Sequence, residues 1–415
     1  MIEIEINRNK IIEGEVDLPS SKSITNRVYI IKSITNDCFN IINPSDSTDS
    51  INLKSIIELI SQQANNEIPQ TLDVRDAGTN MRFLTALLSI TKGLWIITGT
   101  ERMKERPIKD LVEALISLGA DIEYLNKKDY PPLLIRGKTI HGGDISLNTN
   151  ISSQFFSALL LIAPTLDNGL RINISNDIVS FPYIEMTMKI MEYFGINIQK
   201  GKDFIYIKRQ NYTAKDIEIE ADWSSASYWY EIAALSSNCN ITLKGLRKSK
   251  LQGDEIVSKI FENFGVKSEF KNESVILTKK GNINNHISLN CKDFPDLVPS
   301  IAFTCASLGI SAELTGIGHL SYKESDRFDS IISEIKKIGV NCFKEKDTIS
   351  IISSKLINFE NIIFESHNDH RIALSVAPLA LKSGKIRIAD YKVVDKSYPQ
   401  YWENLKNIGL KLKTV

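Results

Sequence analysis

The stretch Asp-Leu-Val-Glu-Ala-Leu-Ile-Ser-Leu-Gly at residues 110–119 shows the design from which this chain is built. Its apolar residues recur with the i, i+3, i+4 spacing of a helix that buries one face. Gly119 then suits the left-handed residue that ends many helices, and the alternating residues that follow are typical of a short strand. The stretch therefore predicts a helix, a glycine stop and a strand.

The same design recurs along the chain. Four more such segments end at Gly195, Gly265, Gly339 and Gly409, so that successive glycines lie 76, 70, 74 and 70 residues apart. A less regular helix at 53–60 precedes them without the glycine. These intervals are longer than those of solenoid repeats and fit an α/β unit with two helices and several strands. Although any helix can end in glycine and a strand, the near-equal spacing favours six copies of one α/β unit, three per domain.

Two crossings between the domains are expected. The segment 211–222 lies between the third and fourth copies and leads into the Ser-rich start of the next helix. The first expected strand ends at Leu18-Pro19, where proline marks a break. We therefore expect one discontinuous domain, residues 1–19 and 223–415, and one inserted domain, residues 20–222.

The composition argues against several classes of protein. The chain has 415 residues and 42% hydrophobic content, enough for two or three domains. Its 50 basic and 50 acidic side chains cancel, whereas nucleic-acid and membrane-surface binders carry a basic excess. No apolar run reaches the roughly 18–20 residues of a membrane span, and the acidic alternation of residues 1–6 is unlike a signal peptide. Five scattered cysteines without a Cys-x-x-Cys pair indicate reduced thiols in the cytoplasm and no metal site.

Polar islands interrupt the apolar pattern in the first half. Pro19-Ser-Ser-Lys-Ser-Ile-Thr-Asn-Arg27 places Lys22 and several hydroxyls at a helix start, where N–H groups and the helix dipole favour an anion. The glycines of a nucleotide-binding P-loop are missing upstream, and a simple helix cap with solvated charges also explains this segment. Similar islands lie at residues 76–82, 101–107, 151–154 and 180–183.

The second half carries more charge at its expected helix starts. Asp296 stands before an apolar helix, where it is either a helix cap or a base. Tyr322-Lys-Glu-Ser-Asp-Arg327 crowds four charges into six residues, and the segments 367–371 and 394–399 complete the set. A surface charge run is usually just solvated, but charges that recur at element junctions are typical of functional residues on a rigid scaffold.

Eight motifs in these islands follow the order of one known family. Between Leu18 and Trp402 the chain contains Pro-Ser-Ser-Lys-Ser-x-Thr-Asn-Arg, Ala-Gly-Thr-x-Met-Arg, Glu-Arg-Met-x-Glu-Arg-Pro-Ile, Ser-Ser-Gln-Phe, Pro-Asp-Leu-Val-Pro, Lys-Glu-Ser-Asp-Arg, Asp-His-Arg and Lys-Ser-Tyr-Pro. Each is weak alone, but in register they are specific, and the chain resembles the 5-enolpyruvylshikimate-3-phosphate (EPSP) synthase family. The resemblance implies a two-domain, inside-out α/β barrel, each domain with three copies of a βαβαββ unit.

The resemblance also implies a function and a set of site residues. The enzyme would transfer the enolpyruvyl group of phosphoenolpyruvate to the 5-hydroxyl of shikimate-3-phosphate in aromatic amino acid biosynthesis, without cofactor or metal. The implied phosphoenolpyruvate ligands are Lys22, Gly78, Arg106, Gln154 and Lys396, with Arg327 and Arg371 on the carboxylate. The implied shikimate-3-phosphate ligands are Lys22, Ser23, Arg27, Ser152, Ser153, Gln154, Ser180, Tyr183, Asp296 and Lys323. The implied catalytic groups are Asp296 as proton acceptor, Glu324 as proton donor to the methylene carbon, and Lys22.

The implied chemistry gives two carboxylates opposite proton roles. Protonation of the methylene carbon of phosphoenolpyruvate creates cationic character at the adjacent carbon. The deprotonated hydroxyl attacks that carbon, and phosphate then leaves. Lys22 and Lys323 are expected to separate the pKa values of the two carboxylates. Ligands divided between domains imply a closing motion that excludes water. Asp76, Phe83 and His319 depart from the family's usual Asn, Pro and Asn, which affects expectations of substrate affinity and glyphosate sensitivity rather than of the reaction.

Two alternatives stay open. UDP-N-acetylglucosamine enolpyruvyl transferases share the fold and the donor, but they carry a loop cysteine before the corresponding Arg-Pro, and residues 99–107 contain none. A non-catalytic RNA-binding protein on the same scaffold would show a basic face, which the charge balance does not favour. We therefore expect a monomer in the cytoplasm that binds the two small substrates, with glyphosate as an inhibitor, and binds neither nucleic acid nor membrane.

Overall fold

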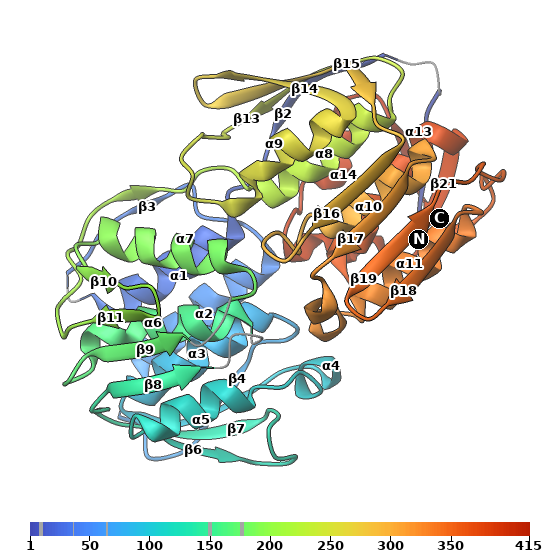
Figure 1. The fold of residues 1–415 in the computed structure, drawn as a ribbon. Helices are drawn as coiled ribbons and strands as arrows, with labels where there is room; N and C mark the ends of the chain where they lie inside the picture. The colour runs from blue at the N-terminus through green and yellow to red at the C-terminus, as the bar shows by residue number, and fades with distance from the viewer. Residues whose placement is uncertain (8–10, 36, 64, 148–151, 175–177) are drawn as a thin grey trace. The chain divides into compact units, whose positions relative to one another are not determined.

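The computed structural model describes residues 1–7, 11–35, 37–63, 65–147, 152–174 and 178–415. They form two compact units (Figure 1). Unit 1 consists of residues 1–21, 46–48 and 220–415, and unit 2 consists of residues 22–45 and 49–219. The chain thus begins in unit 1, builds unit 2 as an insertion, and returns to unit 1.

The two crossings into and out of unit 2 pair with each other through their backbones. Ser20 and Ala221 form an antiparallel bridge, beside which the N–H of Ser21 donates to the carbonyl of Glu220 at 2.9 Å. Unit 1 therefore takes in a few residues on either side that the sequence assigned to the inserted domain. The segment 46–48 also belongs to unit 1, and nothing in the sequence indicated it.

Unit 2 contains two complete copies of a βαβαββ repeat. The first consists of β4 (Gln70–Asp73), α3 (Gly78–Ile90), β5 (Gly93–Thr98), α5 (Lys109–Ser117), β6 (Asp121–Tyr124) and β7 (Leu133–Gly137), with the short α4 (Glu101–Lys104) before α5. The second consists of β8 (Gly143–Leu147), α6 (Ser153–Ile162), β9 (Leu170–Ile174), α7 (Phe181–Tyr193), β10 (Ile198–Lys200) and β11 (Phe204–Ile207). Their sheets have the same order, β4-β5-β7-β6 and β8-β9-β11-β10, with a parallel first pair and antiparallel partners after it.

The remaining copy of unit 2 is reduced. It contains α1 (Lys22–Ile34), β3 (Ile41–Ile42) and α2 (Thr48–Gln62), and β3 pairs in parallel with β12 (Ile217–Glu218) from the end of the unit. Only residues 63–69 separate α2 from β4, too few for the two strands and the turn that end the other copies. The α/β fold class predicted from the sequence is confirmed, with one copy shortened.

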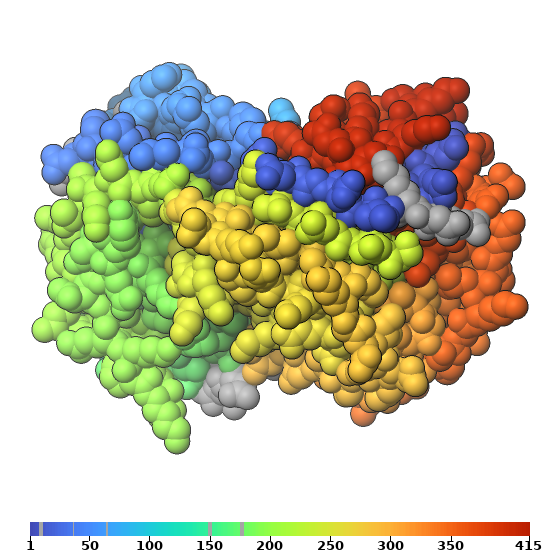
Figure 2. All heavy atoms as spheres, turned by 90° about the horizontal axis from the view of Figure 1, so that it is seen from above, coloured from blue at the N-terminus to red at the C-terminus, as the bar shows by residue number. Residues whose placement is uncertain are grey.

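Unit 1 contains three complete copies, two of which take a strand from the N-terminal segment. One copy is continuous: β16 (His286–Asn290), α10 (Val298–Leu308), β17 (Ser311–Thr315), α11 (Arg327–Lys337), β18 (Asn341–Glu345) and β19 (Thr348–Ile352). Another begins with β2 (Ile12–Asp17) and continues as α8 (Trp223–Leu235), β13 (Cys239–Lys244), α9 (Val257–Ile260), β14 (Phe264–Lys271) and β15 (Ser274–Ile283). The last consists of β20 (Ile363–Phe364), α12 (His370–Val376), β21 (Lys385–Ile388), α14 (Tyr401–Asn407) and β22 (Lys411–Thr414), and it is completed by β1 (Ile2–Glu5). In Figure 2 the dark-blue N-terminal residues accordingly lie beside the red C-terminal ones.

The first helices of the copies are largely buried, and those of unit 1 almost completely. α8 and α12 are buried along their whole length, and α10 along all but its last residue. These three helices pack on one another in unit 1, as α1, α3 and α6 do in unit 2. The strands alternate buried and exposed residues, as in β19, so each sheet keeps one face on this helical core. This is the inside-out arrangement that the resemblance implied.

The second helix of most copies ends as the sequence predicted. The five predicted stop glycines all have φ values between 77° and 106°, the left-handed region that favours glycine. The prediction was wrong for residues 255–265, which form short 3₁₀ turns on either side of α9 rather than one helix. At the start of this segment, the side chain of Asp254 is buried and accepts a hydrogen bond from Ser224.

Candidate active site

Three helix starts lie together in unit 2. Asn26 of α1 donates through Nδ2 to Oδ1 of Asn80 in α3 at 3.1 Å, and Gln154 of α6 donates through Nε2 to Oγ1 of Thr79 in α3 at 3.1 Å. Across the described residues of these three helices, no acid lies in the first turn. The N–H groups and positive dipole ends of three helices therefore favour an anion in this region.

Lys22, the first residue of α1, is oriented by an acid on α2. Its Nζ lies 3.0 Å from Oδ2 of Asp49, and the two side chains are 16% and 17% exposed. The carbonyl of Asp49 accepts from Nδ2 of Asn80 at 2.8 Å, and Ser50 Oγ donates to Oδ1 of Asn26 at 2.6 Å. The ammonium group is thus held by a network that joins α1, α2 and α3.

Arg106 packs against the first residue of α3. It is 5% exposed, and its Nη1 donates to the carbonyl of Asp76 at 3.3 Å. A Cβ atom on Gly78 would lie 2.5 Å from Nη2 and 2.6 Å from Nη1 of this side chain. Glycine at 78 therefore lets the guanidinium lie against the start of α3.

The predicted hydroxyl groups stand at the starts of α6 and α7. Ser152 caps α6 by accepting from the N–H of Gln154 at 3.3 Å, and Ser153 beside it is buried. Ser180 precedes α7 with a left-handed φ of 58° and is 5% exposed. Tyr183 follows in the first turn of α7.

Arg27 joins α1, α6 and α7 from within unit 2. It is 3% exposed, and within the described part of the chain it donates only to neutral groups: Thr187 Oγ1 at 2.7 Å, the carbonyl of Ser23 at 2.7 Å, Ser157 Oγ at 3.2 Å and the carbonyl of Tyr183 at 3.1 Å. Burial lowers the pKa of its guanidinium to about 10. The structure therefore places this predicted ligand where it positions the backbones of Ser23 and Tyr183.

In unit 1, Arg327 binds three carboxylates. Its side chain is 1% exposed. Nε donates to Asp369 Oδ2 at 2.8 Å, Nη2 to Glu324 Oε2 at 2.8 Å, and Nη1 to Asp296 Oδ1 at 3.1 Å. Asp369 also caps α12 by accepting from the N–H of Arg371 at 2.9 Å. Because a buried cation needs such partners, Arg327 fixes Asp296 and Glu324 around one charge.

Asp296 is shared between two arginines. Its second oxygen, Oδ2, lies 2.6 Å from Nη2 of Arg371, whose Nη1 donates to the hydroxyl of Tyr228 at 3.3 Å. Burial acts to raise the pKa of Asp296, but the charges of Arg371, Lys323 and Arg327 outweigh it and hold this pKa well below its usual range. The sequence left open whether Asp296 caps α10; its side chain faces the arginines instead, and α10 begins without a side-chain cap.

Two lysines complete this group in unit 1. Lys396 donates through Nζ to the carbonyl of Asn368 at 3.3 Å, and the charge of Lys323 acts on the pKa of Asp296. The structure thus gathers predicted residues in unit 1: Asp296, Lys323, Glu324, Arg327, Arg371 and Lys396. In unit 2 it gathers a second set: Lys22, Gly78, Arg106 and Gln154, through Asp49, Asn80 and Thr79.

Sequence reasoning gave no role to two acids of unit 1. Asp369 precedes a helix and so carried a recognisable capping signal. Asp254 carried none, because a single Asp in a loop is common. It is 3% exposed and accepts from Ser224 Oγ at 2.5 Å; burial, and next the charge of Asp296, raises its pKa to about 7.

The three departures from the family pattern have structural counterparts. The side chain of Asp76 accepts a hydrogen bond from Thr100. Phe83 is buried and lies under the guanidinium of Arg27, whose Cζ is 5.4 Å from the ring centroid. Nε2 of His319 is buried without a partner among the described residues, and burial is the main cause that lowers its pKa to about 3. This imidazole is therefore neutral at pH 7.

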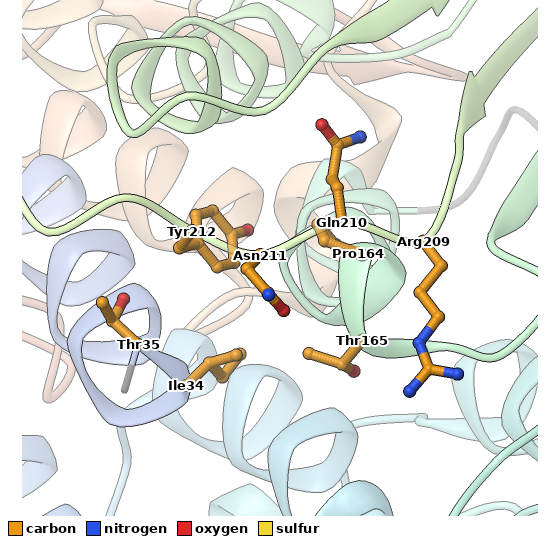
Figure 3. Close-up of a pocket in the computed structure, with 8 residues that line it drawn as sticks. All are labelled: Ile34, Thr35, Pro164, Thr165, Arg209, Gln210, Asn211 and Tyr212. Atoms are coloured by element: carbon orange, nitrogen blue, oxygen red, sulfur yellow. The ribbon is translucent and has the colours of Figure 1, made fainter. Parts of the chain in front are cut away.

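A separate pocket lies at the other ends of α1 and α6 in unit 2. It is lined by Ile34, Thr35, Pro164, Thr165 and the segment 209–212 (Figure 3). Figure 3 shows Gln210 directed away from the other lining side chains, in keeping with its bonds to Asn197 and Lys208. The volume of this pocket, about 210 Å³, is below the roughly 300–1,000 Å³ of usual ligand sites. The 13-residue α1 spans about 20 Å, so this pocket is distant from Lys22.

The described ranges show neither a metal-type cluster nor a membrane-spanning helix. No cluster of three or more His, Cys, Asp or Glu side chains there has the arrangement of a metal site. No helix there has the length and apolar character needed to cross a bilayer.

Comparison with known proteins gave consistent matches. A family model described as EPSP synthase (3-phosphoshikimate 1-carboxyvinyltransferase) matches residues 6–405. A 3-phosphoshikimate 1-carboxyvinyltransferase of Bacteroides fragilis (strain YCH46) is 39% identical over 405 residues, which are 97% of each chain. One of Colwellia psychrerythraea is 35% identical over 431 aligned positions, covering 99% of this chain and 100% of the relative. The structure of EPSP synthase from Acinetobacter baumannii matches with a TM-score of 0.75 and 20% identity over the whole of both chains, which shows a shared fold.

Proposed function

The chain belongs to the EPSP synthase family, the 3-phosphoshikimate 1-carboxyvinyltransferases, and we propose that the residue groups described above carry this family's reaction. The protein is a transferase that moves the enolpyruvyl group of phosphoenolpyruvate to the 5-hydroxyl of shikimate-3-phosphate and releases phosphate, in chorismate and aromatic amino acid biosynthesis. The anion cluster consists of Lys22, Gly78, Arg106 and Gln154 in unit 2. The acid–arginine cluster consists of Asp296, Glu324, Arg327 and Arg371 in unit 1.

The anion cluster binds the phosphate of phosphoenolpyruvate. Support comes from the three helix starts, from the ammonium of Lys22 and from the guanidinium of Arg106 packed on Gly78. An incoming phosphate competes with Asp49 for Lys22, because both are anions. The family resemblance adds Lys396 of unit 1 as a further phosphate ligand.

Arg371 binds the carboxylate of phosphoenolpyruvate through its planar guanidinium fork. Its Nη2 contacts Asp296 at 2.6 Å, so a bound carboxylate takes over part of this contact. Arg327 is engaged by three acids. Its main contribution is therefore positive charge and the placement of Asp296 and Glu324.

Shikimate-3-phosphate binds to the hydroxyls at the starts of α6 and α7 and to cationic groups. Serine hydroxyls at helix starts suit phosphate oxygens and sugar-like hydroxyls, since they donate and accept. Arg27 acts indirectly, because it is buried and holds the carbonyls of Ser23 and Tyr183. The proposed set is Lys22, Ser23, Arg27, Ser152, Ser153, Gln154, Ser180, Tyr183, Asp296 and Lys323.

The proton roles follow from the acid–arginine cluster. Glu324 protonates the methylene carbon of phosphoenolpyruvate, and Asp296 accepts the proton of the 5-hydroxyl. In the free protein the arginines hold the pKa of Asp296 low, which makes its carboxylate a weak base. A substrate carboxylate on Arg371 offsets part of that positive charge, so the pKa of Asp296 rises when phosphoenolpyruvate binds. The co-substrate thereby strengthens the base that the reaction needs.

The placement of Asp296 between Arg327 and Arg371 is the observation that carries this proposal. Phosphate release from phosphoenolpyruvate should be measured with shikimate-3-phosphate, with UDP-N-acetylglucosamine and without acceptor, each with and without EDTA. We expect release only with shikimate-3-phosphate, unaffected by the chelator. Equal turnover with the nucleotide sugar would contradict the acceptor, and no turnover with either acceptor would contradict the catalytic role.

The remaining parts of the proposal concern organisation and partners. Units 1 and 2 are the two domains, and both supply ligands. Glyphosate competes with phosphoenolpyruvate, since it also carries a phosphorus oxyanion and a carboxylate. The protein acts as a cytoplasmic monomer without nucleic-acid or membrane partners, in keeping with its 50 basic and 50 acidic side chains. Inhibition kinetics against each substrate and light scattering of the purified protein test these statements.

A further inference from the structure

Helix α11 holds the loop of residues 365–369 at two points. At its first residue, Arg327 bonds Asp369 through Nε and Nη2 at 2.8 and 3.2 Å. Two turns later, Glu334 lies on the same side of the helix and is 1% exposed. The loop joins β20 to α12, which carries Arg371.

Glu334 is a buried carboxylate directed at this loop. Its Oε2 accepts from the N–H of Glu365 at 3.0 Å, and its Oε1 lies 2.7 Å from Nε2 of His367. Lys337, one turn along the same helix, lies 2.8 Å from Oε2. The donors of His367 and Lys337 lower the pKa of Glu334 despite its burial, so it is an anion at neutral pH.

The loop between these two anchors has an unfavourable backbone conformation. His367 and Asn368 have φ values of 52° and 55°, and neither is glycine. Two consecutive left-handed residues with side chains persist only where the surroundings impose them. The N–H of Asp369 donates to the carbonyl of Ser366 at 2.9 Å and closes the turn.

This turn presents groups to three residues of the proposed site. The carbonyl of Asn368 accepts from Lys396 at 3.3 Å. Asp369 accepts from Arg327 and from the backbone N–H of Arg371. A relaxed turn would therefore move the partners of Lys396, Arg327 and Arg371, three of the cations proposed to bind phosphoenolpyruvate.

We propose that Glu334 is a positioning residue, which holds the left-handed turn at His367 and Asn368 and thereby places Lys396 and Arg371 for phosphoenolpyruvate. This inference rests on the proposed function of those two cations. Among the described contacts, Glu334 touches neither the anion cluster nor the acid–arginine cluster. Its effect on the reaction must therefore pass through the loop.

The test compares Glu334→Gln, His367→Asn and the control Lys337→Met. Glutamine keeps the size of Glu334 but loses its charge and one of the two acceptor oxygens that contact Glu365 and His367. Asparagine suits a left-handed φ as histidine does and is too short to reach Glu334, so it removes the contact without changing the backbone preference. Lys337→Met removes another partner of the same carboxylate that lies outside the loop.

Wild-type phosphate release is measured first, because its absence would overturn the proposed function rather than this inference. In folded Glu334→Gln and His367→Asn we expect the KM for phosphoenolpyruvate to rise by about 10–100-fold, the usual scale for groups misplaced by about 1 Å. The KM for shikimate-3-phosphate should change by less than about threefold, and Lys337→Met should change neither constant by more than that.

The double variant Glu334→Gln/His367→Asn should be no worse than the worse single variant, because both remove one contact. An unchanged KM for phosphoenolpyruvate in either folded variant would overturn the proposal. Equal rises of both Michaelis constants, or a lower melting temperature as the only effect, would reduce Glu334 to a stabilising group. If Glu334→Gln does not fold, the half-buried His367→Asn decides the question by the same criteria.

Discussion

Replacing Gly78 with alanine would place one methyl group against the guanidinium of Arg106. The new Cβ would lie 2.5, 2.6 and 2.8 Å from Nη2, Nη1 and Cζ. Ordinary contact is about 3.5 Å, so the guanidinium must move by about 0.7–1 Å. The backbone is no obstacle, because Gly78 opens α3 outside the left-handed region, and alanine favours a helix over glycine by up to about 1 kcal/mol.

The cost should therefore fall on substrate binding and not on folding. The hydrogen bond from Arg106 to the carbonyl of Asp76 is already long, 3.3 Å, and a displaced guanidinium would disturb it further. Losing one charge-assisted hydrogen bond to the substrate phosphate costs about 1.5–3 kcal/mol, which corresponds to about 10–100-fold in affinity. The KM for phosphoenolpyruvate should rise by this factor, while that for shikimate-3-phosphate should stay within about threefold.

The measurement is steady-state kinetics with each substrate varied in turn, beside a thermal melt. Arg106→Lys serves as the comparison, because lysine lacks the planar fork that collides with the methyl group. In that background Gly78→Ala should cost less than in the wild type. An unchanged KM for phosphoenolpyruvate in both single variants would remove Arg106 from the substrate site. A fall in melting temperature without a selective kinetic effect would show that the contact serves packing alone.

Asp296→Asn and Glu324→Gln should each fold and lower kcat by about 10²–10⁴-fold, and a near-normal kcat beside an unchanged melting curve would contradict their proton roles. Arg371→Lys should raise the KM for phosphoenolpyruvate by about 10–100-fold, and a shift of the melting temperature alone would assign it to the fold. Glu231 has both carboxyl oxygens buried without a partner among the described residues, and burial raises its pKa. Glu231→Met should therefore raise the free energy of unfolding by about 1–3 kcal/mol. Denaturant titration at pH 7 measures this change, and a decrease would refute the reasoning. The pKa of Asp254 is raised from 3.8 to about 7, so its carboxyl group loses its proton at lower pH in the unfolded chain than in the folded one. The stability that Asp254 contributes therefore falls as the pH rises from about 4 to about 7. Asp254→Asn should flatten the pH dependence of the free energy of unfolding in this range, and an unchanged slope would contradict this role.

The sequence revealed the repeat through its second helices because those helices are half exposed. An amphipathic helix such as α11 shows its period in the order of its residues, and the glycine after it marks its end. The first helices show no such signal. α8 is buried on every side, so its apolar and small residues follow no face, and its central place could not be predicted from spacing.

The sequence suggested which residues belong to the candidate site, but it did not suggest how they are connected. Motifs pointed to Asp296, Glu324 and Arg327, yet the role of Arg327 depends on Asp296 and Asp369, which lie 31 and 42 residues away in the chain. Arg27 was implied as a ligand by the family resemblance. A sequence cannot show that its guanidinium turns inward to neutral acceptors on two other helices.

During synthesis, the N-terminal strands β1 and β2 of unit 1 remain unpaired until their distant partner strands have been made. As the chain leaves the ribosome, β1 and β2 emerge well before their partners, because β2 pairs with β13 and β1 pairs with β21 and β22. At about 5–20 residues per second, β1 waits on the order of 20–80 s for its last partner, while unit 2 has all its strands much earlier. An unpaired strand of alternating isoleucines invites pairing with other chains, and interspersed charges discourage it. The charge of Glu3 therefore discourages pairing of β1 with other chains during synthesis. In the finished fold, Glu3 binds Lys385 and Arg387 and so helps to set the register of β1 against β21.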